Sequence, residues 1–161
     1  MKRLLIALTL ACSLLVGCSG SNSTPIVNEP VQPASDTIIG FYFYYPGGSF
    51  SSPEYEITKT EDGFLFVGRH QPYGDFEVDI DEAALGELQD IIIEHDIQSW
   101  NGFDERAPED EISSINLQFG IEILYVDGTV ITARGDHAFP EGYIEAKDAL
   151  IAFLNALAES N

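Results

Sequence analysis

Clustered carboxylates are the residues of this chain whose type and spacing could most directly do chemistry. The densest cluster lies between residues 104 and 111 and consists of Asp104, Glu105, Glu109, Asp110 and Glu111. Calcium takes about six to eight oxygen ligands in loose geometry, so these carboxylates are candidate ligands for Ca²⁺. The cluster lacks the glycine and the alternating ligand spacing of an EF-hand. A solvated acidic loop is therefore the simpler interpretation, and calcium binding is the alternative.

Nucleophilic and zinc chemistry have little support in the sequence. No serine lies in a G-x-S-x-G elbow, and His70, His95 and His137 are far apart along the chain. Paired cysteines and closely spaced histidines, which would indicate a zinc site, are also missing. The acidic row at 75–79 alternates with apolar residues and is typical of a strand with one solvated face. The sequence therefore predicts a protein that is not an enzyme.

An aromatic run over residues 41–45 is the strongest indication of a binding surface. In a strand, Phe41, Phe43 and Tyr45 face one side of the sheet, and Tyr42 and Tyr44 face the other. If helices cover only one side, the two tyrosines become candidate ligand-binding residues, because exposed tyrosines make good recognition surfaces. The alternative, a central strand with both sides covered, is the interpretation that we favour from the sequence alone.

Apolar periodicity and turn residues place these side chains on predicted elements. Alternation of apolar and polar residues predicts strands, and Asp62-Gly63 and Asp127-Gly128 predict hairpin turns. Apolar residues at helical spacing predict two helices, the first of which follows the N-cap residue Asp81. The expected strands are 38–45, 55–60, 64–67, 76–80, 115–126 and 129–133, and the expected helices are 82–95 and 141–158.

The order of these elements predicts the fold class. Hairpin turns make neighbouring strands antiparallel, and two helices most simply cover one face of a sheet. We therefore expect an α+β fold with a single, mostly antiparallel sheet of about six strands and two helices packed on one face. One globular domain should span residues 37–161, and Trp100 should fill its core after the first helix.

The N-terminal segment has the pattern of an export signal. Two basic residues precede an apolar run of 13 residues at 4–16, which is too short to cross a bilayer as a helix. The run ends in Leu15-Val16-Gly17-Cys18, which resembles the lipobox of bacterial lipoproteins. The resemblance implies a signal peptide at residues 1–17 and a diacylglycerol on Cys18, with a further acyl chain such as palmitate on the new amino terminus. In the alternative, an ordinary secretory signal, the cysteine is incidental.

Residues 18–36 are expected to form a lipidated cysteine and a flexible linker. Ser, Asn and Pro dominate this stretch, and it has no apolar periodicity. The membrane is then a partner through the lipid anchor. Ser19 follows the cysteine, whereas an aspartate there commonly retains lipoproteins at the inner membrane. The lipobox resemblance therefore implies the outer membrane in a double-membraned source, and otherwise the outer face of the cell membrane.

The second half of the chain carries a further resemblance. Residues 100–103 (WNGF), the Asp127-Gly128 turn and residues 139–143 (FPEGY) together are similar to a domain of uncharacterised bacterial lipoproteins. The resemblance brings no known activity with it.

Charge narrows the range of partners. The chain has 27 acidic and seven basic residues, and every acidic residue follows Cys18. Phosphates would be repelled, so nucleic acid is excluded as a partner. We therefore expect a non-enzymatic binding module for a protein, above all a basic envelope protein, or for another envelope ligand. The alternative is a calcium-dependent structural or assembly lipoprotein, and a cell-wall-acting enzyme with paired carboxylates is the third hypothesis.

Overall fold

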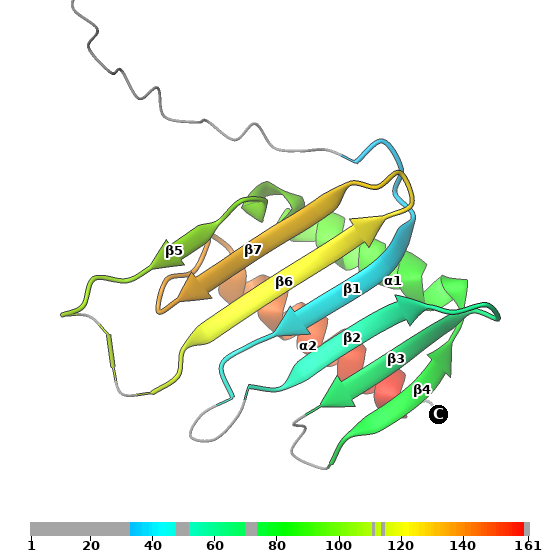
Figure 1. Cartoon of the computed structure of the whole chain (residues 1–161), viewed down its shortest axis with the longest axis horizontal. Helices are drawn as coiled ribbons and strands as arrows, with labels where there is room; N and C mark the ends of the chain where they lie inside the picture. Colours follow the sequence, from blue (N-terminus) through cyan, green and yellow to red (C-terminus); the bar gives the residue numbers. More distant parts are fainter. Residues whose placement is uncertain (1–32, 48–51, 70–73, 111, 114, 160–161) are drawn as a thin grey trace, which may run out of the picture.

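The computed structural model describes residues 33–47, 52–69, 74–110, 112–113 and 115–159, which form one sheet and two α-helices (Figure 1). The strands are β1 (Ile38–Tyr44), β2 (Glu54–Lys59), β3 (Phe64–Arg69), β4 (Phe76–Ile80), β5 (Asp104–Arg106), β6 (Gln118–Tyr125) and β7 (Val130–Asp136). The helices are α1 (Glu82–Glu94), the short 3-10 helix η1 (Ile97–Trp100) and α2 (Tyr143–Glu159). The predicted signal peptide, Cys18 and most of the linker lie outside the described residues.

The sheet has seven strands in the order β4-β3-β2-β1-β6-β7-β5. Every neighbouring pair is antiparallel except β5 and β7, which are parallel. The Asp127-Gly128 hairpin joins β6 to β7 as predicted, because Gly128 adopts a φ of 86° and the Asp127 carboxylate accepts the Thr129 N–H at 2.8 Å. The first strand, β1, lies at the centre of the sheet (Figure 1).

The predicted α+β class is confirmed, but the expected number of strands was too low. The strand that we did not expect, β5, lies in the segment predicted to be an acidic loop, and all three of its residues are exposed. It has no apolar alternation because it is held through its backbone. Ala107 N–H donates to the Asp136 carbonyl at 2.9 Å, and Arg134 N–H donates to the Phe103 carbonyl at 2.8 Å. Such pairing leaves no hydrophobic pattern in the sequence.

Several predicted boundaries also differ from the structure, and three of these differences have a clear physical cause. β6 begins at Gln118 rather than Ile115, whose side chain is exposed. β7 continues to Asp136, where β5 pairs with it, instead of ending at Ala133. α2 begins at Tyr143 rather than residue 141, because Gly142 takes a φ of 75° that a right-handed helix does not contain.

Both helices lie on the same side of the sheet (Figure 1). Asp81 is the predicted N-cap of α1, and its carboxylate accepts the Ala84 N–H at 3.1 Å. The helices turn apolar stripes towards the strands, and the buried members include Leu85, Leu88, Ile92, Ala146, Leu150 and Leu154. Within the described ranges, neither helix has the length and apolar character required to cross a membrane.

The core lies between the sheet and these helices. Alternate strand residues enter it, among them Phe43, Phe66 and Phe119, which are fully buried. Trp100 fills the core after α1 as predicted, with its ring against Phe119 and Tyr143. The Trp100 indole N–H donates to the Glu141 carbonyl at 3.2 Å and so fastens η1 to the start of α2.

Two buried tyrosines differ in how their hydroxyl groups are satisfied. The Tyr55 hydroxyl donates to the Asn155 side chain at 2.8 Å, which links β2 to α2. The Tyr143 hydroxyl has no hydrogen-bond partner among the described residues. Burial is the main cause that raises the pKa of both phenols above 10.0, because the charged phenolate would lose its hydration.

The raised pKa of both buried phenols predicts that the fold loses stability at alkaline pH. Both phenols stay protonated in the folded chain while the unfolded chain ionises them above about pH 10, so the free energy of unfolding should fall as pH rises past that value. Tyr143→Phe should leave stability at pH 8 nearly unchanged and reduce the alkaline loss. Tyr55→Phe should lower stability at pH 8 by about 1 kcal/mol, because a hydrogen bond is lost. Urea unfolding at pH 8, 10 and 11 measures both effects, and an unaltered alkaline slope in Tyr143→Phe would contradict this account.

Candidate functional site

The face of the sheet opposite α1 and α2 is uncovered by any described element, and we call it the open face. Phe41 and Phe43 point under the helices and are buried, whereas Tyr42 and Tyr44 lie on the open face and are half-buried. β1 is central, as we favoured from the sequence, but both helices lie on one side of the sheet (Figure 1). The buried Phe41 and Phe43 point to that side. The expectation that both sides of this strand are covered was therefore wrong for the tyrosine side.

Tyr42 lies between carboxylates from both neighbouring strands. It is in register with Glu56 of β2 and with Glu122 of β6. Burial raises the pKa of Tyr42, and the charge of Glu54 and a hydrogen bond to that carboxylate raise it further. Tyr42 therefore presents an aromatic ring and a hydroxyl group between carboxylates.

Tyr44 packs beside Tyr42, with 5.9 Å between the ring centroids. Its ring lies over Gly120 of β6, in the space that a Cβ atom at that position would occupy. The absence of a side chain at Gly120 thus allows Tyr44 to lie against the sheet. Burial raises the pKa of Tyr44, and the positive charge of Arg134 opposes this increase.

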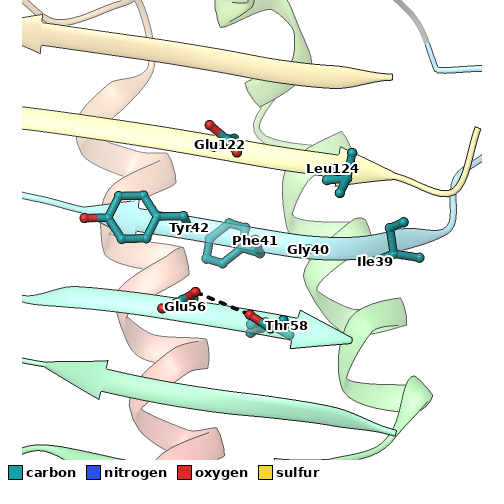
Figure 2. A pocket seen from close by; sticks show the side chains of 9 residues that line it. Ile39, Gly40, Phe41, Tyr42, Glu56, Thr58, Glu122 and Leu124 are labelled. Atoms are coloured by element: carbon teal, nitrogen blue, oxygen red, sulfur yellow. Dashed lines mark hydrogen bonds between the residues drawn. The ribbon is translucent and has the colours of Figure 1, made fainter. Parts of the chain in front are cut away.

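A shallow hollow of about 200 Å³ adjoins Tyr42 (Figure 2). Its floor is at Gly40, which has no side chain, and Leu124 forms an apolar wall. Glu56 and Glu122 come from the strands on either side of β1. The lining residues are Ile39, Gly40, Phe41, Tyr42, Glu56, Ile57, Thr58, Glu122 and Leu124. Apolar walls beside two carboxylates and an aromatic ring suit the aliphatic stem and the cationic end of a lysine or arginine.

The open face is negatively charged beyond the hollow. Strand alternation places the carboxylates of Glu54, Glu56, Glu77, Asp79 and Glu122 on it. Arg69 lies on the same face and pairs with Glu56 at 2.7 Å, so it neutralises part of this charge. The remaining excess of carboxylates gives a cationic partner a favourable field to approach.

The described carboxylates of the acidic segment, Asp104, Glu105, Glu109 and Asp110, are spread over exposed positions. Asp104 and Glu105 are exposed in β5, Glu109 and Asp110 are exposed in the turn that follows, and Glu111 lies outside the described residues. In the described part of the chain, no three His, Cys, Asp or Glu side chains come together in a way that could hold a metal ion. Calcium binding therefore stays a prediction, and the positions of these described carboxylates give it no support.

One polar group was missed by sequence reasoning. His137 Nδ1 lies 2.8 Å from Asp136 Oδ1, and His137 Nε2 lies 3.4 Å from Ser113 Oγ. Ser113 and His137 are 24 residues apart in segments without a recognised motif, so only the fold reveals their contact. Of the other histidines, His95 caps the C-terminus of α1, and His70 lies outside the described residues.

Comparison of the chain with protein-family models, with curated proteins and with solved structures finds no match. The function is therefore inferred from the open face and from the sequence of the N-terminal segment.

The close packing around Gly135, two residues before His137, gives a stability prediction. A Cβ atom at Gly135 would overlap the Ala138 carbonyl and the Phe119 ring, so Gly135→Ala should lower the free energy of unfolding by about 1–3 kcal/mol. Gly86→Ala is the matched control. Open space surrounds Gly86 in α1, and this change should raise stability by about 0.5–1 kcal/mol. Urea unfolding of both variants provides the test, and equal effects would show that the overlap is relieved without penalty.

Proposed function

We propose that the chain is an envelope lipoprotein whose domain binds a basic polypeptide on the open face of its sheet. The observation that carries this proposal is the pair of half-buried tyrosines, Tyr42 and Tyr44, which lie among carboxylates on the open face of a central strand. Tyrosine supplies contact area at low entropic cost, and the surrounding charge selects for cationic partners.

The hollow suggests how one partner residue is held. A lysine or arginine stem would lie over Gly40 against Leu124, and its charged end would approach Tyr42, Glu56 and Glu122. Glu56 already pairs with Arg69, so Glu122 would supply most of the free charge at this position. A basic enzyme that acts on the envelope, such as a muramidase, is one class of protein with suitable side chains.

The N-terminal segment supports the membrane part of the proposal. Its lipobox-like Leu15-Val16-Gly17-Cys18 would place two or three acyl chains at Cys18, which is enough for stable attachment. Residues 19–36 would then hold the domain away from the surface. We place the protein on the outer membrane of a double-membraned cell, or otherwise on the outer face of the cell membrane.

Binding is predicted to depend on the open face rather than on total charge. Residues 33–161 should bind poly-lysine and a basic muramidase of the lysozyme class, measured by calorimetry at low and moderate salt. Tyr42→Ala should weaken binding about tenfold, and Glu122→Gln should weaken it about threefold with a smaller salt dependence. Glu145→Gln on α2 is the matched control, because it removes one exposed charge from the helix side. Equal losses from Glu122→Gln and Glu145→Gln would contradict a located binding face, as would failure of both probes to bind.

Anchoring is predicted to depend on Cys18. In bacteria fed with labelled palmitate, the full chain should acquire the label and sediment with membranes. Cys18→Ser should lose the label and leave the membrane fraction, while Ser19→Ala should keep both. Membrane attachment that persists in Cys18→Ser would contradict the proposed lipid anchor.

A further inference from the structure

We propose that Ser113, His137 and Asp136 form a nucleophile, base and orienting acid that allow Ser113 to be acylated by small esters. This site lies at the end of β7. Asp136 lies on the open face by strand alternation, but Ser113 and His137 are not among the residues proposed to bind the basic partner. Ser113 Oγ is 3.4 Å from His137 Nε2, and His137 Nδ1 is 2.8 Å from Asp136 Oδ1. The three groups thus follow the order in which serine hydrolases arrange their nucleophile, base and acid.

The hydrogen bonds around the group fix the direction in which protons can move. In the tautomer that carries its proton on Nδ1, His137 donates to Asp136 Oδ1, and Nε2 is then an acceptor that faces Ser113. The Ile115 N–H donates to Ser113 Oγ at 3.4 Å, so the serine proton is free to be donated to Nε2. The Ser113–His137 separation is long for a hydrogen bond, and such contacts commonly shorten when substrate binds.

Backbone and side-chain contacts hold His137 and Asp136 in place. His137 has a φ of 58°, a left-handed conformation that is uncommon for residues other than glycine, and its N–H donates to the Leu117 carbonyl at 3.1 Å. The second oxygen of Asp136 pairs with Arg106 Nε at 3.2 Å. The His137 side chain is only 8% exposed, whereas Ser113 is exposed. The base is shielded from solvent and the nucleophile is accessible.

The proposed reaction is ester hydrolysis in two steps. Ser113 Oγ attacks the ester carbonyl carbon while its proton passes to His137 Nε2, and the bond to the alcohol then breaks as Nε2 returns that proton to the leaving oxygen. Water next gives a proton to Nε2 and attacks the acyl group on Ser113. Breakage of the acyl–serine bond, with the proton returned to Oγ, releases the carboxylic acid. Ser113 is exposed, so a small ester such as p-nitrophenyl acetate can reach its Oγ directly from solvent.

Labelling with a fluorophosphonate probe tests the nucleophile directly. The mature chain is incubated with the probe, and mass spectrometry of its peptides identifies the modified residue. We expect label on Ser113 and slow release of p-nitrophenol from p-nitrophenyl acetate, and both should be lost in Ser113→Ala. Ser99→Ala is the matched control, because the Ser99 hydroxyl donates to the Asp96 carbonyl and has no histidine contact among the described hydrogen bonds.

Variants of the base separate catalysis from folding. His137→Asn tolerates the positive φ and should lower the labelling rate about 100-fold with little loss of stability. His137→Gly should also be slow, and added imidazole should restore part of its rate. Asp136 is a positioning residue, so Asp136→Asn should be slow, while Asp136→Glu should recover part of the rate because it keeps a carboxylate.

Two results would overturn the proposal. One is the absence of label on Ser113 in a folded wild-type chain. The other is an equal labelling rate in wild type and in folded His137→Asn, since His137 would then not activate the serine. Binding of poly-lysine should be unchanged in Ser113→Ala, so failure of this inference is separable from failure of the proposed binding function.

Discussion

Burial of one side of a seven-stranded sheet under two helices is the constraint on which the rest of the structure depends. Each strand alternates, so the residues that enter the core fix what the opposite side must present. Phe41 and Phe43 enter the core, and this leaves Tyr42 and Tyr44 on the open face. No described element covers those tyrosines. A candidate binding surface therefore follows from the same alternation that builds the core.

Local patterns were sufficient to predict the parts of the fold that rest on side-chain chemistry. The Asp127-Gly128 turn, the N-cap Asp81 and the core position of Trp100 each have a local physical signature, and each is found where expected. β5 could not be predicted, because its three exposed residues are held by backbone pairing with β7. Alternation predicted that Phe41 and Phe43 face one side of the sheet and that Tyr42 and Tyr44 face the other. Which of the two sides the helices cover could not be predicted, because it depends on how distant segments pack.

Some candidate sites could likewise be predicted from the sequence, whereas others appear only in the fold. Tyr42 and Tyr44 could be proposed from the sequence because five aromatic residues in succession are conspicuous. The hollow at Gly40 was not predictable, since it needs Leu124 and Glu122 from a strand far along the chain. The same holds for Ser113 and His137, which meet only when β7 carries the histidine to the loop before β6. The acidic character of segment 104–111 was predictable from the sequence, and its four described carboxylates lie at exposed positions of β5 and the following turn. Calcium binding by this segment stays a prediction.

The proposed binding function joins the acidic charge of the domain to the two tyrosines on its open face. Long-range attraction would bring a basic partner to the domain, and contact with Tyr42 and its neighbouring carboxylates would then define where it binds. The most direct test is mass-spectrometric side-chain footprinting of residues 33–161 with and without poly-lysine. We predict that Tyr42 and Tyr44 become protected, while Ile144, which is exposed on α2, stays equally reactive. Protection of Ile144 with no change at Tyr42 would contradict the assignment of the open face as the binding surface.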